Sequence, residues 1–156
     1  MIDLAYYTSE ATTLLNSLIG IPSLSREEEA AADFLQNYIE ETGIMTGRSG
    51  NNIWCISPMF DLNKPTILLN SHIDTVKPVN GWRKHPFTPK AENGKIYGLG
   101  SNDACASVVY FKFTAIYLPP NRLITLSFWL HAKKKCQART VLKVFCPSFH
   151  PLHWVL

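Results

Sequence analysis

A histidine and two aspartates stand at places in this sequence where they could bind metal ions. His72 and Asp74 follow an apolar run, and Asp103 follows a turn that contains Gly98 and Gly100. Imidazole and carboxylate groups are common zinc ligands in hydrolases. Two zinc ions roughly 3.5–4 Å apart can lower the pKa of a water molecule and polarise an amide carbonyl. The two motifs therefore predict half of a two-metal hydrolase site.

The three residues are expected to take different parts in such a site. His72 follows an apolar strand, so its imidazole can project into a cleft at the carboxyl end of that strand. Asp74 can accept the other ring N–H of His72, which fixes the tautomer and makes the imidazole a stronger ligand. Asp103 follows glycines that allow close backbone approach, and it is the candidate for a carboxylate shared by both metals. Either motif alone is more often an ordinary polar pair or turn, whereas the two in this order are far more specific.

The pattern before these motifs predicts two helices. Apolar residues recur at helical spacing over residues 4–19 and again from Ala31 to Ile39. Ser25 and Glu28 fit a capping box at the start of the second helix. A plausible stop for that helix is Gly43.

Shorter apolar runs predict strands, and a helix is expected to begin at Asp103. The strands are expected at residues 51–56, 65–70 and 95–97. The run at 65–70 is continuous, which is typical of a strand buried on both faces of an α/β sheet. Two helices followed by strands with polar residues at their ends predict a three-layer α/β domain.

Residues 1–109 resemble the N-terminal part of the acetylornithine deacetylase and succinyl-diaminopimelate desuccinylase family of zinc-dependent aminoacylases and exopeptidases. The resemblance is carried by residues 71–76, 82–87, 94–98 and 100–103. It implies a zinc-exopeptidase-like catalytic domain with three layers, of which this chain holds the N-terminal portion. In that family the first histidine binds one metal, the aspartate two residues later supports it, and the second aspartate bridges both metals. These roles carry over to His72, Asp74 and Asp103.

The second motif departs from the usual family pattern. Leu99 stands where arginine is usual, and Ala104 and Cys105 stand where lysine and glycine are usual. The pattern is nearest the acetylornithine deacetylase-like branch. The resemblance thus implies hydrolysis of N-acyl-L-ornithine, a small N-acyl amino acid, in arginine biosynthesis, with two zinc ions per site or with cobalt. It also implies a homodimer in intact members, formed by an inserted domain that this chain is expected to lack.

Several classes of protein are excluded by composition. The sequence has no uninterrupted apolar run of about 18 residues, so no membrane partner is expected. The N-terminal residues lack the pattern of a signal peptide, which predicts a cytoplasmic location. The four cysteines have neither zinc-finger nor redox spacing.

The charge changes sign along the chain. Residues 1–109 contain all twelve acidic residues and eight basic ones, a net charge of −4. Residues 110–156 contain seven basic residues and no acidic one. Average composition would place about five or six acids in a segment of this length. We therefore divide the chain into a metallohydrolase part, 1–109, and an aberrant basic tail, 110–156, that is expected to be poorly ordered.

A shift of reading frame explains this tail. Family members present two adjacent glutamates after the bridging aspartate, one as general base and the next as metal ligand. This chain has Lys133, Lys134 and Lys135 instead, and no glutamate after Glu92. Read one base out of register, consecutive lysine codons permit glutamate codons, and the following codons permit a Glu-Glu-x-x-Gly-x-x-Gly pattern. We place the shift near Val109 or Tyr110 and expect this chain to be a truncated, inactive hydrolase.

Two other interpretations of the tail remain open at this point. The lysines with Arg139 and Lys143 resemble a basic patch that binds nucleic acid nonspecifically, which would make the chain a non-enzymatic binding protein. A small metal site could use the tail residues Cys136, Cys146, His150 and His153, although their spacing does not match zinc fingers.

Overall fold

The computed structural model describes residues 3–58, 60–61, 63–117 and 125–131. The helices are α1 (Leu4–Gly20), α2 (Glu29–Glu40) and α3 (Ala106–Tyr117), and a short π-helical turn, η1 (Ser101–Cys105), precedes α3. The strands are β1 (Thr46–Ser49), β2 (Asn52–Ile56), β3 (Thr66–His72), β4 (Lys90–Glu92), β5 (Lys95–Tyr97) and β6 (Thr125–His131).

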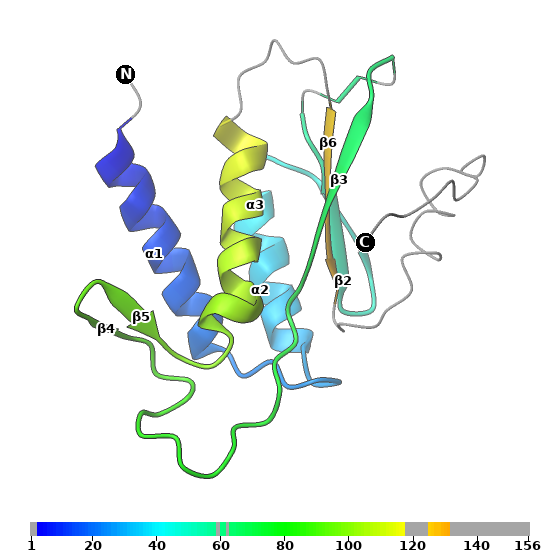
Figure 1. Cartoon of the computed structure of the whole chain (residues 1–156). Helices are drawn as coiled ribbons and strands as arrows, with labels where there is room; N and C mark the ends of the chain where they lie inside the picture. The colour runs from blue at the N-terminus through cyan, green and yellow to red at the C-terminus, as the bar shows by residue number, and fades with distance from the viewer. Residues whose placement is uncertain (1–2, 59, 62, 118–124, 132–156) are drawn as a thin grey trace.

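One mixed sheet packs against the helices. Its strand order is β1-β2-β6-β3, with β6 parallel to β3 and antiparallel to β2. Figure 1 shows all three helices on the same side of this sheet, with the small β4–β5 hairpin beside α1. The parallel register pairs His72 with His131, so β3 and β6 end at the same edge of the sheet. The α/β prediction is therefore confirmed.

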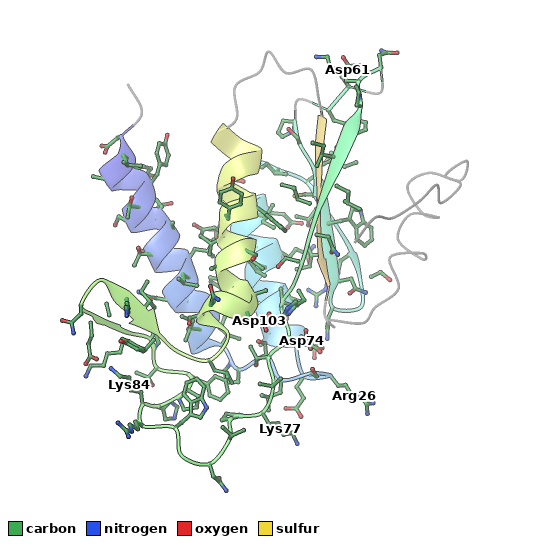
Figure 2. The ribbon with its side chains drawn as sticks, in the orientation of Figure 1. Arg26, Asp61, Asp74, Lys77, Lys84 and Asp103 are labelled. Carbon is green, nitrogen blue, oxygen red and sulfur yellow. The ribbon has the colours of Figure 1, made fainter. Side chains whose placement is uncertain are left out.

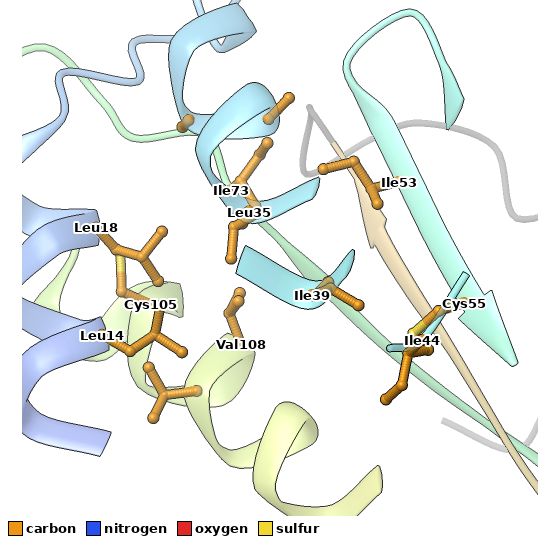
Figure 3. Packing of buried hydrophobic residues seen from close by; sticks show 13 residues of the cluster. Leu14, Leu18, Leu35, Ile39, Ile44, Ile53, Cys55, Ile73, Cys105 and Val108 are labelled. Atoms are coloured by element: carbon orange, nitrogen blue, oxygen red, sulfur yellow. The ribbon is translucent and has the colours of Figure 1, made fainter. Parts of the chain in front are cut away.

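The core lies between the helices and the sheet (Figure 3). Its buried side chains come from all three helices and from β2, and the largest fully buried ones include Leu14, Ile19, Leu35 and Ile53. Burying an aliphatic side chain of this size contributes about 1.5–3 kcal/mol. This packing fixes α3, and with it η1, against the end of β3.

The first helix agrees with its prediction, whereas the start of the second does not. Asp3 caps α1 by accepting a hydrogen bond from the backbone of Tyr6. The capping box at Ser25 is wrong, because α2 begins at Glu29 and Glu28 is its N-cap residue. The hydroxyl of Ser25 instead bonds to Asp74, and Glu28 accepts the N–H of Arg26. Long-range contacts thus replace the local cap.

The predicted strands are present, but one is less buried than expected. Strand β3 is an edge strand among the described residues, and its Ile67 side chain is 42% exposed. Burial on both faces is therefore wrong for this strand. Strand β1 was not predicted because its residues, Thr-Gly-Arg-Ser, carry no apolar alternation.

Regular structure continues beyond residue 109. Helix α3 begins at Ala106 rather than at Asp103 and runs without interruption to Tyr117, and β6 follows at residues 125–131. Helix α3 therefore spans residue 109, and the division into a metallohydrolase part and an aberrant tail stays a prediction. The remaining tail residues, 118–124 and 132–156, lie outside the described part of the chain, as do the candidate ligands among them. No helix within the described part has both the length and the apolar character needed to cross a bilayer.

Candidate metal site

The end of strand β3 brings His72 and Asp74 to one edge of the sheet. His72 is the last residue of the strand, and its neighbours Ser71 and Ile73 are buried. Asp74 is 4% exposed. Figure 2 shows Asp74 close to Asp103, where the chain leaves β3 and where α3 begins. The packed strand thus fixes the backbone from which both side chains of the first motif project.

A tight turn brings Asp103 to the same place. Gly100 has a φ of +75°, a conformation that favours glycine, and a Cβ there would lie 2.7 Å from the Thr75 side chain. Asp103 itself is non-helical, with φ −118° and ψ 89°, although it lies within η1. The glycine therefore allows the turn to approach the chain just after Asp74, which delivers Asp103 to the first motif.

The His72 ring lies between acceptors on both sides. Its Nδ1 lies 3.1 Å from the Asp74 carbonyl oxygen and 3.2 Å from the Asp74 Oδ1. Its Nε2 lies 2.9 Å from the Asp103 Oδ1. A neutral imidazole carries only one N–H. With that proton on Nδ1, the lone pair of Nε2 faces a carboxylate oxygen, and a cation shared by the two would relieve their repulsion.

The carboxylate of Asp74 is held from the side away from the histidine. Its Oδ2 accepts a hydrogen bond of 2.5 Å from the Ser25 hydroxyl. Its Oδ1 is buried and accepts no hydrogen bond from the described residues, although Nδ1 of His72 lies 3.2 Å away. A single N–H on Nδ1 can point at one acceptor, and the Asp74 backbone carbonyl, rather than Oδ1, has the geometry of a hydrogen bond to it. Asp74 therefore acts on the histidine by charge and by its carbonyl.

Nε2 of His72 and the Asp103 carboxylate suit one metal ion. Donors about 2.0–2.2 Å from a tetrahedral zinc lie roughly 3.3 Å apart, close to the separation of these two atoms. The Asp103 side chain is 65% exposed, and that of His72 is 17% exposed, so both can be reached from solvent. Within the described ranges no three histidine, cysteine or acidic side chains cluster to hold a metal. The described chain therefore offers two donors for one ion and no set for a second.

Cys105 does not complete the site, although it follows Asp103 closely. Burial is the main cause that raises the pKa of this thiol to about 11. A metal ligand must be the thiolate, and a thiol with this pKa stays protonated at neutral pH. Its sulfur belongs to the hydrophobic core, in a cluster with Leu14, Leu18 and Val108.

The structure brings together all three side chains that the motifs singled out. The sequence reasoning missed Ser25 as a partner of Asp74, because its spacing from Glu28 indicates a local cap. No spacing in the sequence indicates a contact across 49 positions. The contact arises because the connection between α1 and α2 passes beside the end of β3.

Comparison with known proteins supports the same reading. Residues 68–122 match the model of the family described as "Peptidase family M20/M25/M40". A succinyl-diaminopimelate desuccinylase of Xylella fastidiosa (strain M12) is 28% identical over 139 residues, covering 83% of this chain and 36% of that protein. Human carnosine dipeptidase 1 has the same fold over 90% of this chain and 36% of its own, with a TM-score of 0.73 and 15% identity. Bacillus subtilis YXEP, described as "a Dinuclear Metal Binding Peptidase from M20 Family", matches with a TM-score of 0.56 and 19% identity over 83% of this chain and 36% of its own.

These matches confirm the resemblance that the motifs indicated. The matched segment contains both motifs and extends past residue 109 to residue 122. The matched family is one of hydrolases that act on peptide and related amide bonds, and the fold of this chain is similar to part of the fold of such proteins. The chain spans about a third of the length of the curated relatives it matches, 29% and 36% in two of them.

Proposed function

From this match to the M20/M25/M40 peptidases, we propose that the chain carries the first half of a metal-dependent site for hydrolysing N-acyl amide bonds. The observation that supports this most directly is the facing pair of His72 Nε2 and Asp103 Oδ1, 2.9 Å apart at the end of strand β3. A metal-binding histidine needs an acceptor for one ring N–H and a free second nitrogen toward the ion, and the surroundings of His72 fit that need.

The three residues divide the work as follows. His72 and Asp103 would hold the ion, and Asp103 would be the carboxylate shared with a second ion. Asp74 keeps the proton on Nδ1 and leaves Nε2 free to bind metal. Zinc, when bound, would polarise an amide carbonyl and make water more acidic. Zinc or cobalt is the proposed metal.

The proposed substrates are N-acyl derivatives of diamino acids. The curated relatives carry the name succinyl-diaminopimelate desuccinylase. The second motif, with Leu99 and Cys105, favours the acetylornithine deacetylase-like branch, which would place the parent enzyme in arginine biosynthesis in the cytoplasm. N-acetyl-L-ornithine and N-succinyl-L,L-diaminopimelate are therefore the two substrates to compare.

The chain as written is proposed to have negligible hydrolase activity. β6 ends beside His72, at the edge of the sheet that carries the proposed site. A hydrolase of this kind needs a general base and further carboxylate ligands. The sequence after His131 has Lys133, Lys134 and Lys135 and no acidic residue. A shifted reading frame in residues 110–156 remains our explanation.

The proposal is tested by metal binding and by activity. Zinc is titrated into the purified chain and into His72→Ala and Asp103→Ala, with His85→Ala in the exposed loop as the matched control. We expect weak binding of one ion, lost in the first two variants and kept in the control. Binding that survives both site variants would contradict the metal site. Turnover of either substrate with added zinc or cobalt would contradict the inactivity.

A further inference from the structure

We propose that Ser25 is a positioning residue for His72, acting through the carboxylate of Asp74. This inference rests on the proposed metal-binding function and adds a residue to it. Ser25 lies in the connection between α1 and α2, 49 positions before Asp74 in the sequence. Nothing in the metal motif itself indicates that this connection takes part.

The contact between the two side chains is the first support. The Ser25 hydroxyl donates to Oδ2 of Asp74 over 2.5 Å, a length typical of a hydrogen bond to a charged carboxylate. Asp74 is 4% exposed, and its other oxygen accepts no hydrogen bond from the described residues. A buried carboxylate needs donors in place of water. Among the described residues, Ser25 supplies the one hydrogen bond that this side chain accepts.

The backbone on either side holds the two partners in register. The N–H of Thr75 donates to the Ser23 carbonyl over 2.7 Å, and the N–H of Ser25 donates to the Thr75 carbonyl over 3.2 Å. Leu24 and Thr75 form a parallel bridge. The serine backbone is thus attached to the residue that directly follows Asp74, which keeps the Ser25 hydroxyl within reach of the Asp74 carboxylate.

The buried carboxylate of Glu28 holds the turn that contains Ser25 and Arg26. Arg26 has a φ of +83°, which is uncommon for a residue other than glycine. Its N–H donates over 2.5 Å to the carboxylate of Glu28, which is 1% exposed and also accepts from the Asn51 side chain. Such conformations persist when the surrounding structure enforces them, and they cluster at functional sites. Figure 2 shows Arg26 on this turn close to Asp74.

These contacts form a continuous path from the turn to the metal-binding nitrogen. Ser25 orients the Asp74 carboxylate, Asp74 faces Nδ1 of His72, and Nε2 faces Asp103. Without the hydroxyl, the Asp74 side chain could rotate, and its charge would no longer add to the backbone carbonyl in holding the proton on Nδ1. Removing a group that contacts a ligand typically weakens metal binding 10–100-fold, so a group one step further away should weaken it about threefold to tenfold.

The test compares three serine variants of the full chain. Ser25→Ala removes the hydroxyl, Ser25→Thr restores one, and Ser17→Ala removes a hydroxyl that donates to the Thr13 backbone carbonyl within α1. Two quantities are measured at one fixed pH. The first is the pair of ring ¹⁵N chemical shifts of His72 in the metal-free protein, which report the position of the proton. The second is the affinity for zinc, followed through the same signals.

We expect the unchanged chain to show the Nδ1–H form and Ser25→Ala to show shifts averaged between the two tautomers. Zinc affinity should fall about threefold to tenfold in Ser25→Ala, return in Ser25→Thr and stay unchanged in Ser17→Ala. The inference is overturned if Ser25→Ala matches Ser17→Ala in both quantities, or if threonine restores neither. If the unchanged chain binds no zinc, the proposed function fails, while the nitrogen shifts still decide whether Ser25 positions the histidine.

Discussion

At the scale of single residues, the site depends on how one imidazole is oriented. His72 has acceptors on both ring nitrogens, and only one of them can receive an N–H from the neutral ring. The Asp74 carbonyl and carboxylate both favour the proton on Nδ1. The free Nε2 and the Asp103 Oδ1 then face each other 2.9 Å apart, slightly closer than two ligands of one tetrahedral zinc.

Replacing Asp74 by asparagine should weaken zinc binding without removing a metal donor. The amide keeps the volume of the carboxylate but loses its charge, so its pull on the His72 Nδ1 proton is reduced. We expect the zinc affinity of Asp74→Asn to fall about 10–100-fold, as measured by titration. Asp61→Asn, a change in an exposed loop far from the site, should bind as the unchanged chain does. Equal affinities in the two variants would remove Asp74 from the site.

Gly100 should tolerate a side chain much less well than a glycine with a similar backbone. Gly100 and Gly94 have φ values of +75° and +72°, so alanine is strained at both. Only at Gly100 would the new Cβ meet a neighbour, the Thr75 side chain at 2.7 Å, whereas Gly94 has open space. Gly100→Ala should therefore displace Asp103 and weaken zinc binding, while Gly94→Ala should cost about 1 kcal/mol of stability and leave zinc affinity unchanged. Equal zinc affinities in Gly100→Ala and Gly94→Ala would contradict the close approach of Gly100 to the Thr75 side chain.

At the scale of elements, helix α1 packs against α3 and η1, the turn that carries Asp103. Leu14 on α1 is 1% exposed and belongs to the cluster that contains Cys105 and Val108. Leu4 on the same helix is 75% exposed. The two leucines thus offer a matched comparison of one substitution in two environments.

Leu14→Ala should lower the free energy of unfolding by about 2–5 kcal/mol, because it removes buried surface and leaves a cavity. Leu4→Ala should change it by no more than about 0.5 kcal/mol. Urea denaturation followed by circular dichroism measures both values. Similar losses at the two positions would contradict the burial of α1 against η1 and α3.

A second element-scale prediction concerns the loop that joins the two motifs. Lys84 of this loop bonds to Glu92 of β4 and lies 4.1 Å from the ring centre of Tyr97 on β5. Hydrogen bonds from Lys84, and then from Lys90, lower the pKa of Glu92 to about 2. A carboxylate whose pKa is lowered on folding stabilises the fold above its unfolded pKa and loses that effect as the pH falls through the folded value.

Glu92→Gln should therefore be less stable than the unchanged chain near neutral pH. The difference should shrink between about pH 4.5 and about pH 2, as protonation removes the charge in the unchanged chain as well. High salt should reduce it at any pH, because these groups are exposed to solvent. Denaturation midpoints across this range measure the effect, and Glu27→Gln, at an exposed position outside this loop, is the control. A difference independent of pH would contradict the proposed pairing.

The sequence predicted the elements that follow local rules and missed those that depend on distant contacts. The spacing of apolar residues predicted α1 and β2, and the two motifs predicted that His72 and Asp103 share one site. Ser25 was predicted to be a helix cap because the capping rule considers only residues close in sequence. Its hydroxyl instead donates to Asp74, 49 positions away. The exposed side of β3 was missed because a continuous apolar run does not tell an edge strand from a central one.

At the scale of the whole molecule, the sheet determines which segments meet at the site. The carboxyl ends of β3 and β6 lie side by side, and the register pairs His72 with His131. The described end of β6 therefore lies next to the end of β3, which carries the proposed ligand His72. The chain spans about a third of the length of its curated relatives.

The last prediction concerns the identity of the segment that follows β6. Lysines near a metal site repel the cations that it would bind, whereas carboxylates attract and hold them. Lysine codons read one base out of register permit glutamate at Lys133, Lys134 and Lys135. We expect independent sequencing across the codons for Ser107 to Tyr117 to reveal one lost or gained base. A gene corrected at that base should encode a protein with the glutamate pair, tighter zinc binding and turnover of an N-acyl diamino acid. An intact reading frame in independent clones would refute the shift, and the tail would then be tested as a basic binding segment by salt-dependent retention on heparin.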